Sequence, residues 1–483
     1  MKKILFYNWV PFDETERKGG GVTVYTRNLI EELCQRKDVE LFFLSSGRAY
    51  DLLHTDVRIE STDNIFGRRV HSFQIVNSPV FSSALISFPF VEIYLNDGLL
   101  LPLLKSFLEE KGPFDVVHFQ NWEGLSAACF QLKQFFPGTK FIYSLHNYYP
   151  FCPHVNLWKA AENCSCRGDC GEACISCMPK DVFADKVRIN QYVNYLKAGK
   201  REVPEKLLAF QKSAGEYYSE AGGFQDKFRD PELAEKYGRL FKRFADVNIA
   251  GLNNGMDYVL AVSERVKKIA HFHGLKAEKT FVSYIGHAMA EHRQKPKSID
   301  LSHPLHIAYL GYMTEPKGFY FLLSALESMS DNMARKLEVT IAAPGKDAAA
   351  LERVESIRQR FAAIHYYDGY TKEKLPGILK TVDLGLVPVL WEDNLPQVAI
   401  EMKLSGIPVL SSDMGGAQEL SGDPAFVFQA GNREDFLQHL LYLQKNRAKL
   451  LDYWKGGVVT PTMGEHIDEL YRYYGWNEEG NQV

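Results

Sequence analysis

The sequence has no long hydrophobic run. A helix that spans a bilayer needs roughly 18 to 20 apolar residues, and the longest candidate, ALISFPFVEIYL (84–95), is interrupted by Pro89 and Glu92. The N-terminal MKKILFYNWVPFD is broken by Asn8 and lacks a small-residue cleavage site, so a first β-strand is a better interpretation than a secretion signal. We therefore expect a cytoplasmic protein that can also contact the inner face of the membrane.

An excess of charge of either sign is also missing. The chain has 56 Lys and Arg against 60 Asp and Glu, a formal net charge of -4, and 46% hydrophobic residues. Because nucleic-acid-binding domains usually carry a basic excess, nucleic acid is not expected as a partner. A soluble chain of 483 residues exceeds one ordinary domain, which predicts two domains, each with its own core.

Short apolar runs of strand length alternate with longer amphipathic stretches, and this happens twice along the chain. The pattern predicts two α/β domains with parallel sheets, in residues 1–285 and 305–460. The polar segment 286–304 is interpreted as a linker, and 461–483 as a C-terminal helix that packs back on the first domain. A cysteine cluster and a charged, helix-forming stretch break the rhythm at about 152–250, which is interpreted as an insertion in the first domain.

Two glycine-containing stretches each lie between an expected strand and an expected helix. In KGGGVTVYTRNLIEELCQR, Gly20 and Gly21 would let a phosphate or sugar approach the backbone at a helix N-terminus. On this stretch alone, a glycine-rich surface turn is the preferred interpretation. In YLGYMTEPKGFYFLLSALE, Lys317 and Gly318 precede a helix. A lysine is unfavourable at the positive end of a helix dipole unless an anion binds there. A solvated surface lysine is the alternative.

The stretch EDNLPQVAIEMKLSGIPVLSSDMGG (392–416) carries two acids around one helix start. Asp393 and Asn394 are typical N-cap residues, and Pro396 fits the first helical turn. Glu401 lies in a mostly apolar helix between two buried strands. A carboxylate in such a place is costly unless it accepts hydrogen bonds, and a ribose diol would donate two.

The combination resembles a known family. Lys317–Gly318, the spacing of eight between Asp393 and Glu401, GIPVLSSDMGG and the N-terminal triple glycine together resemble the family four retaining glycosyltransferases, also called group 1. The resemblance implies the GT-B fold, an α/β architecture in which two Rossmann-like, doubly wound parallel-sheet domains face a cleft, here with a cysteine-rich helical insertion in the first domain. It covers roughly residues 1–150 and 255–475.

The resemblance also implies an activity. Such an enzyme transfers a sugar from a UDP-, GDP- or ADP-sugar to a glycan or lipid-linked saccharide, as in cell-surface polysaccharide synthesis, with no cofactor for catalysis. The implied donor-binding residues are Gly20, Gly21, Lys317, Gly318, Tyr370, Asp393, Asn394, Leu395, Pro396 and Glu401, and the implied catalytic residues are His146, Gln120, Lys317 and Asp393.

The implied roles differ along the donor. Glu401 would hold the ribose, Asp393 would contact the transferred sugar, and Lys317 would neutralise the diphosphate. Tyr370 would lie near the base, and the backbone amides of residues 394–396 would meet the diphosphate or the sugar. Gln120 and His146 end two strands of the first domain and would lie near the anomeric carbon, whereas His118 is interpreted as a packed strand residue.

Two positions depart from the family pattern. The usual arginine after the strand glycine is Tyr312, and a frequent histidine is replaced by Gln120. The sequence also contains no Asp-x-Asp triplet, so metal-dependent binding of the diphosphate is not expected. The departures leave a non-catalytic nucleotide-sugar-binding or scaffold protein as an alternative, together with other GT-B enzymes such as a nucleotide-sugar epimerase. A Rossmann dehydrogenase is disfavoured because no G-x-G-x-x-G follows the first strand.

Six of the eight cysteines fall in one short segment. Close thiols in a cytoplasmic chain more often bind a metal than form disulfides. A structural zinc held by four of the six is the leading interpretation, and an iron–sulfur cluster or a pair of disulfides is the alternative. The candidate ligands are Cys152, Cys164, Cys166, Cys170, Cys174 and Cys177.

Overall fold

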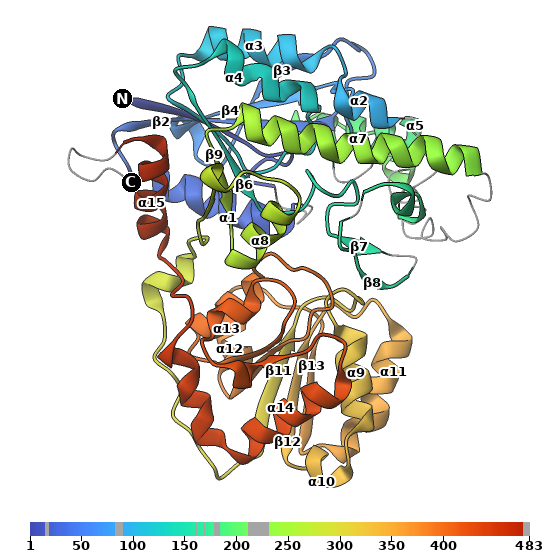
Figure 1. The fold of residues 1–483 in the computed structure, drawn as a ribbon, viewed down its shortest axis with the longest axis vertical. Helices are drawn as coiled ribbons and strands as arrows, with labels where there is room; N and C mark the ends of the chain where they lie inside the picture. Colours follow the sequence, from blue (N-terminus) through green and yellow to red (C-terminus); the bar gives the residue numbers. More distant parts are fainter. Residues whose placement is uncertain are drawn as a thin grey trace.

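The structure is a computed structural model, and it describes residues 1–14, 19–82, 90–159, 162–168, 170–177, 184–210 and 231–476. Two α/β domains stand one above the other along the long axis of the molecule (Figure 1). Within the described residues, no helix combines the length and the apolar character needed to cross a membrane.

The first domain is built on an eight-stranded sheet with the order β10-β9-β6-β5-β1-β2-β4-β3. Every described pairing in it is parallel except that of β3 with β4. The strands are β1 (Lys2–Tyr7), β2 (Val39–Ala49), β3 (Arg58–Thr62), β4 (Val70–Val76), β5 (Val116–Phe119), β6 (Lys140–Leu145), β9 (Tyr258–Ala261) and β10 (Thr280–Val282).

Helices cover both faces of this sheet (Figure 1). They are α1 (Gly20–Leu33), α2 (Val91–Leu95), α3 (Leu100–Lys111), α4 (Leu132–Phe135), α5 (Ala184–Ala198), α7 (Pro231–Gly255) and α8 (Glu264–Phe272). The segment predicted to be an insertion contributes α5, most of α7 and the short pair β7 (Trp158–Lys159) and β8 (Cys164–Ser165). Part of it, including 211–230, lies outside the described residues, as do residues 84–89 of the apolar stretch and the last seven residues of the predicted C-terminal helix.

The second domain contains a six-stranded, entirely parallel sheet with the order β13-β12-β11-β14-β15-β16. The strands are β11 (Leu305–Leu310), β12 (Leu337–Ala342), β13 (Ala363–Tyr367), β14 (Leu384–Val387), β15 (Val409–Ser412) and β16 (Val427–Phe428). The helices are α9 (Phe319–Ser328), α10 (Asp331–Ala334), α11 (Ala348–Ile357), α12 (Leu375–Leu379), α13 (Gln397–Leu404) and α14 (Arg433–Lys445).

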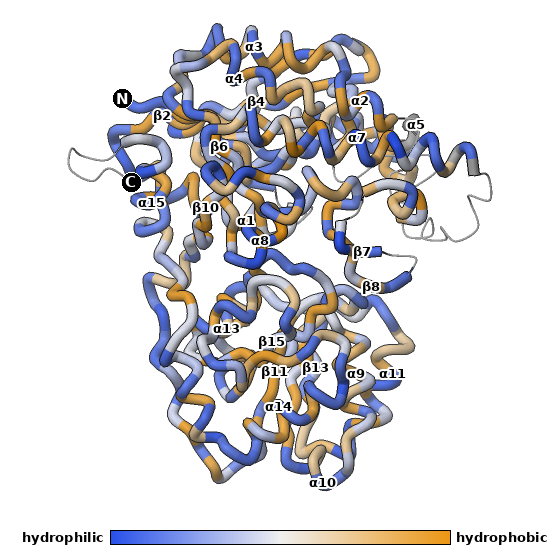
Figure 2. Tube along the Cα trace, in the orientation of Figure 1, coloured by the Kyte–Doolittle hydropathy of each residue, from blue (hydrophilic) through white to orange (hydrophobic). Residues whose placement is uncertain are grey.

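The central strands β1 and β11 are buried over most or all of their length. All six residues of β11 are buried, and residues 4–7 of β1 are at most 2% exposed. Figure 2 shows β11 as a hydrophobic segment inside the second domain. A strand covered by helices on both faces has no polar side, which is why the sequence shows continuous apolar runs rather than alternation. The prediction of two parallel-sheet α/β domains is confirmed.

The last helix, α15 (Met463–Tyr474), follows the second domain and lies against the first (Figure 1). It begins with a capping box between Thr462 and Glu465. Its side chains reach the core of the first domain, where the His466 Nε2 lies 2.7 Å from the Tyr25 hydroxyl and the Tyr474 hydroxyl lies 2.7 Å from His118 Nδ1. The chain therefore crosses between the domains twice.

Candidate active site

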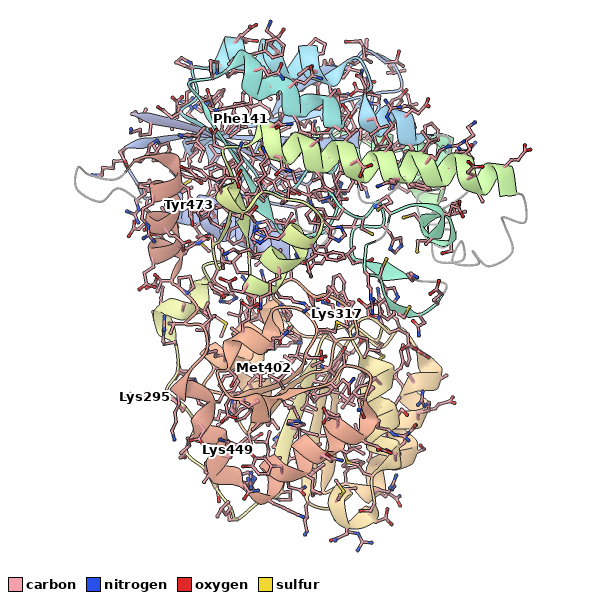
Figure 3. All side chains as sticks on the ribbon, viewed as in Figure 1. Phe141, Lys295, Lys317, Met402, Lys449 and Tyr473 are labelled. Atoms are coloured by element: carbon pink, nitrogen blue, oxygen red, sulfur yellow. The ribbon has the colours of Figure 1, made fainter. Side chains whose placement is uncertain are left out.

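The second-domain half of the site is built on two loops that follow β11 and β14. Gly318 precedes α9 with φ 72°, and a Cβ there would lie 1.7 Å from the carbonyl oxygen of Pro388. Only glycine permits both this left-handed conformation and this approach. The contact holds Lys317 against the loop that leads to α13, at the edge of the second domain that faces the first (Figure 3).

Lys317 and Asp393 form an ion pair across these loops. The Lys317 Nζ lies 2.6 Å from Asp393 Oδ2 and 5.1 Å from the ring centroid of Trp391. The Asp393 residue is 8% exposed. The structure thus brings together the residues that the sequence assigned to the diphosphate and the transferred sugar, and it places their opposite charges in direct contact.

Glu401 is buried in α13, with 8% of its surface exposed. Tyr370 donates a hydrogen bond from its hydroxyl to Glu401 Oε2 at 3.3 Å. Burial raises the pKa of Glu401, while the bond from Tyr370 and the charge of Lys372 oppose that shift. The two residues predicted to bind the ribose and the base are therefore neighbours, and the carboxylate has a polar partner despite its apolar helix.

The start of α13 differs from the sequence-based prediction. Pro396 occupies the N-cap position and makes no side-chain cap, whereas Asp393 and Asn394 were predicted as caps. Asp393 is instead engaged by Lys317, and the Asn394 amide reaches the Leu145 carbonyl of the first domain at 3.5 Å. The amides of the first turn consequently lack a side-chain cap, which suits a helix terminus that meets an anion. Leu395, the middle residue of the predicted backbone site, is buried.

The first-domain half contains Gln120 and His146 at the ends of β5 and β6. The His146 Nε2 lies 2.9 Å from Gln120 Oε1, so these two predicted catalytic residues are in contact. Burial, followed by the nearby His466, lowers the pKa of His146 to about 3, which keeps the ring neutral. The ring of Tyr25 lies 4.9 Å from that of His146. His118 is fully buried between Ser144 and Tyr474, in the packed position expected of it.

The glycine turn of the first domain approaches the loop 388–396 of the second domain, which leads from β14 to α13 and is called the donor loop below. Gln397, the first residue of α13, donates from Nε2 to the Gly21 carbonyl at 2.9 Å. Gly20 adopts φ 57°, a conformation that favours glycine. The N-termini of α1 and α13 are therefore joined by a hydrogen bond, with both predicted glycines beside the interface.

Several further contacts between the domains were not predicted from the sequence. Arg265 donates from Nε to Glu392 Oε2 at 2.8 Å, and Ser263 donates from Oγ to the Asn394 carbonyl at 2.8 Å. The Glu419 carboxylate accepts the backbone N–H of Glu264 at 2.9 Å and of Arg265 at 2.7 Å. The partners are separated by 127 to 155 residues, so a single sequence carries no local signal that would pair them.

In the part of the chain that the structure describes, no disulfide links the six clustered cysteines, and none involves Cys34 or Cys129. Cys170 donates to the Phe151 carbonyl at 2.8 Å, and the Gly168 N–H donates to Cys166 Sγ at 3.2 Å. A hydrogen bond between the thiols of Cys170 and Cys174 raises the pKa of Cys170 and lowers that of Cys174. Across the described residues, no three His, Cys, Asp or Glu side chains are arranged to hold a metal ion.

A hollow of about 680 Å³ lies elsewhere in the second domain, between α9 and the N-terminus of α14. Its lining contains none of the predicted site residues. We assign the site to the facing loops because they combine the ion pair, the buried acid and the uncapped helix terminus.

Comparison with known proteins identifies the family. Residues 304–446 match the family model described as glycosyl transferases group 1, and residues 19–163 match the model of glycosyltransferase family 4. The chain belongs to the group 1 glycosyltransferases. The two matches cover one stretch of each domain of this glycosyltransferase, including Gly20 and Gly21 in the first and Lys317 to Glu401 in the second. No curated protein sequence matches it.

Solved structures confirm that the glycosyltransferase has the GT-B fold. The Anabaena HepE structure in complex with UDP and glucose is 13% identical with a TM-score of 0.53, covering 98% of this chain and 100% of that chain. The sucrose-phosphate synthase from Thermosynechococcus elongatus is 16% identical with a TM-score of 0.55, covering 98% of each chain. The lipopolysaccharide outer core galactosyltransferase WaaB is 12% identical with a TM-score of 0.53, covering 97% and 98%.

Proposed function

We propose that this glycosyltransferase moves a sugar, with retention of configuration, from a nucleotide-sugar to a glycan or lipid-linked saccharide in cell-surface polysaccharide synthesis. The observation that carries the proposal is the contact of Lys317 with Asp393 at 2.6 Å, directly before the uncapped N-terminus of α13. A cation and free helix amides suit a diphosphate, and the adjacent carboxylate suits a sugar hydroxyl.

The donor is proposed to be a UDP-sugar. The HepE structure contains UDP and glucose, and a trehalose-phosphate synthase at a TM-score of 0.51 is described as UDP-forming. In this chain Glu401 would accept hydrogen bonds from the ribose hydroxyls and Tyr370 would lie beside the base. Lys317 and the amides of the first turn of α13 would neutralise the diphosphate without a metal ion.

Transfer breaks the bond between the anomeric carbon and the diphosphate oxygen and forms a bond from that carbon to the acceptor oxygen. The proton of the acceptor hydroxyl passes to the departing phosphate oxygen on the same face of the sugar. Gln120 and neutral His146 would orient the sugar and contribute dipoles rather than act as nucleophiles. Lys317 would stabilise the negative charge that grows on the leaving group.

The test combines binding and turnover. UDP, GDP and ADP are screened by thermal shift, because a ligand raises the melting temperature according to its affinity, and UDP-sugars are then incubated with saccharide acceptors. We expect Lys317→Ala and Glu401→Ala each to lower kcat/KM at least 100-fold, with Lys336→Ala on the exposed surface as the control. Wild-type turnover in either site variant would contradict the assigned site.

A second candidate is a nucleotide-sugar-binding protein without catalysis. Tyr312, which stands where the family has an arginine, is 51% exposed and brings no positive charge to the diphosphate. Binding of UDP-sugars without transfer or hydrolysis would favour this candidate. Conversion of the donor sugar to its epimer without an acceptor would instead identify an epimerase.

A structural zinc at the cysteine segment stays part of the proposal. The six candidate ligands fall between residues 152 and 177, and no disulfide links them within the described residues. Thiolates at such spacing suit a soft metal ion. Metal analysis of anaerobically purified protein tests the site, and metal-free protein with all thiols titratable would exclude it.

A further inference from the structure

Three buried polar side chains near the glycine turn of the first domain contain atoms without a hydrogen-bond partner. They are the Asn8 amide, both of whose polar atoms are unpartnered, the Gln120 amide nitrogen and the Thr23 hydroxyl. Asn8 is 1% exposed, Gln120 is 0% exposed and Thr23 is 4% exposed. Buried polar atoms are nearly always hydrogen-bonded, so a group of exceptions in one place requires an explanation.

Asn8 and Gln120 are next to each other in space. β1 and β5 are parallel neighbours in which Tyr7 pairs with Phe119, and the Gln120 N–H donates to the Tyr7 carbonyl at 2.8 Å. Each amide residue directly follows the end of its strand, at the edge that faces the second domain. Neighbouring strands lie about 4.8 Å apart, so one small ligand can reach both side chains.

The alternation of the strands places these amides on the face that carries His146. The rings of Phe6 and His118 lie 5.6 Å apart on that face, and Asn8 and Gln120 each come two residues later in the chain. The contact of Gln120 with His146 at 2.9 Å confirms the direction of the Gln120 side chain. The unpartnered atoms are therefore grouped beside the proposed reaction centre.

Thr23 reaches this region from the first turn of α1. A Cβ on Gly19 would lie 1.8 Å from the Thr23 hydroxyl oxygen and 3.3 Å from Val10 Cβ, two residues beyond Asn8. Gly19 therefore lies against Thr23 and beside the segment that follows Asn8, and the glycines of this turn let the backbone shift at little steric cost when a ligand enters.

We propose that Asn8, Thr23 and Gln120 form a hydroxyl-binding pocket for a sugar, a conclusion that rests on the proposed glycosyl transfer. A carboxamide with a free N–H donor and a free carbonyl acceptor matches two neighbouring hydroxyls, each of which both donates and accepts. The Gln120 amide nitrogen adds a hydrogen-bond donor, and the Thr23 hydroxyl adds a group that both donates and accepts. The set carries no charge, which suits sugar hydroxyls rather than a phosphate. The pocket determines which saccharide is held opposite the donor loop.

The experiment compares two threonines of the same helix. Thr23→Val removes an unpartnered hydroxyl at nearly constant volume, whereas Thr26→Val removes a hydroxyl that donates to the Val22 carbonyl at 2.8 Å. Asn8→Leu, with Asn8→Ala as a second variant, removes the unpartnered amide. Melting temperatures are measured without ligand, with UDP, and with glucose, galactose, mannose or N-acetylglucosamine, each alone and together with UDP.

We expect Thr23→Val and Asn8→Leu to melt at or above the wild-type temperature, because removal of an unpartnered polar group relieves an unfavourable burial. We expect the same variants to lose the melting shift that a monosaccharide causes in the wild type, and to lose at least tenfold in kcat/KM, while Thr26→Val keeps both. A rise in KM for the acceptor assigns the acceptor sugar to the pocket, and a rise in KM for the UDP-sugar assigns the transferred sugar.

Two results would overturn the pocket. One is a monosaccharide shift and a kcat/KM that stay within twofold of wild type in folded Thr23→Val and Asn8 variants. The other is a wild-type protein that no monosaccharide stabilises. Failure of the proposed function is separate, since it would show as absence of any shift with UDP, which binds the second domain.

Discussion

At the scale of single residues, the ion pair of Lys317 and Asp393 sets the local charge of the proposed donor site. Their contact at 2.6 Å means that a diphosphate must compete with the aspartate for the same ammonium group. In the proposed site the carboxylate would also repel the phosphates directly. The proposed site would therefore bind UDP less tightly than the lysine alone would allow, and Asp393 would be useful only if it contacts the transferred sugar.

We expect Asp393→Asn to bind UDP about tenfold more tightly, which corresponds to about 1.4 kcal/mol, and to lose transfer activity. The asparagine keeps the shape but removes the competing charge. Isothermal titration with UDP at low and high salt measures the first effect, and the gain should shrink at high salt. Unchanged or weaker UDP binding in this variant would show that the aspartate does not compete with the diphosphate.

We expect substitution of Glu401 to have opposite effects on the stability of the protein and on its affinity for UDP. Burial raises its pKa, so the native state binds a proton more readily than the unfolded chain, and ionisation at neutral pH costs stability. Glu401→Gln should therefore raise the melting temperature at pH 7. The same change should weaken UDP binding about 10- to 100-fold, since a hydrogen bond to a charged group contributes about 1.5–3 kcal/mol.

The pH dependence of UDP binding provides the control for Glu401. In the wild type, affinity should fall as pH drops through the raised pKa of this carboxyl, at a higher pH than for an ordinary glutamate. In Glu401→Gln that part of the pH dependence should vanish. A variant with the wild-type pH profile would place the titrating group elsewhere.

The sequence reveals residues that break a local pattern and misses those whose meaning depends on distant partners. Glu401 is conspicuous because it is an acid in an apolar helix, and Lys317 because it precedes a helix. Asn8 and Thr23 look ordinary, since only the three-dimensional structure shows that their polar atoms have no partner. Asp393 was predicted to cap α13, but an ion pair with a lysine 76 residues away outweighs a local cap.

At the scale of elements, the N-terminus of α8 is closed by a carboxylate from the other domain. Glu419 accepts two backbone N–H groups of α8 and the Tyr284 hydroxyl at 2.7 Å. A carboxylate at a helix N-terminus contributes about 0.3–1 kcal/mol when exposed and up to about 2 kcal/mol when partly buried. The contact fixes the N-terminus of α8 in the first domain against the segment that follows β15 in the second domain.

We expect Glu419→Ala to loosen the packing of the two domains. The radius of gyration from small-angle X-ray scattering should increase. KM for both substrates should also rise, because the parts of the proposed site on the two domains would be in contact for a smaller fraction of the time. Glu434→Ala, in the first turn of α14 and exposed to solvent, is the matched control. An unchanged scattering profile together with an unchanged KM would show that Glu419 only caps the helix.

The strand and helix pattern was predictable, whereas the interfaces between elements were not. Continuous apolar runs identify β1 and β11 because strands covered on both faces need no polar side. The pairs formed by Glu419, Arg265 and Ser263 with the other domain depend on how the two sheets face each other. The hydrophobic periodicity of a single strand or helix carries no information about how the two sheets face each other.

At the scale of the whole molecule, the two domains are joined by hydrogen bonds at the site and by α15 behind it. The helix supplies His466 and Tyr474 to the first-domain core, so α15 is packed behind His146 of the site. Folding of the first domain therefore depends on residues that follow the second. This arrangement also places the buried His118 and His466 and the partly buried His146 in one region of the core.

Because of these histidines, we expect the free energy of unfolding to fall in mild acid. Burial lowers the pKa of His118 well below its usual value, that of His146 to about 3 and that of His466 to about 4. An unfolded histidine has a pKa of about 6.5, so between that pH and about pH 4 the unfolded chain binds protons that the native state excludes. Each histidine then removes up to about 1.4 kcal/mol of unfolding free energy per pH unit.

We expect the urea midpoint to fall steeply between pH 7.5 and pH 5.5, and His466→Gln to remove one histidine's share of that fall. The variant is less stable at pH 7.5, because glutamine fits the Tyr25 hydroxyl less well, yet its curve against pH is flatter. His292→Gln, at an exposed position, should keep the wild-type slope. Parallel curves of urea midpoint against pH for wild type and His466→Gln would mean that His466 binds a proton as readily in the native core as in the unfolded chain. Burial would then not hold this histidine neutral.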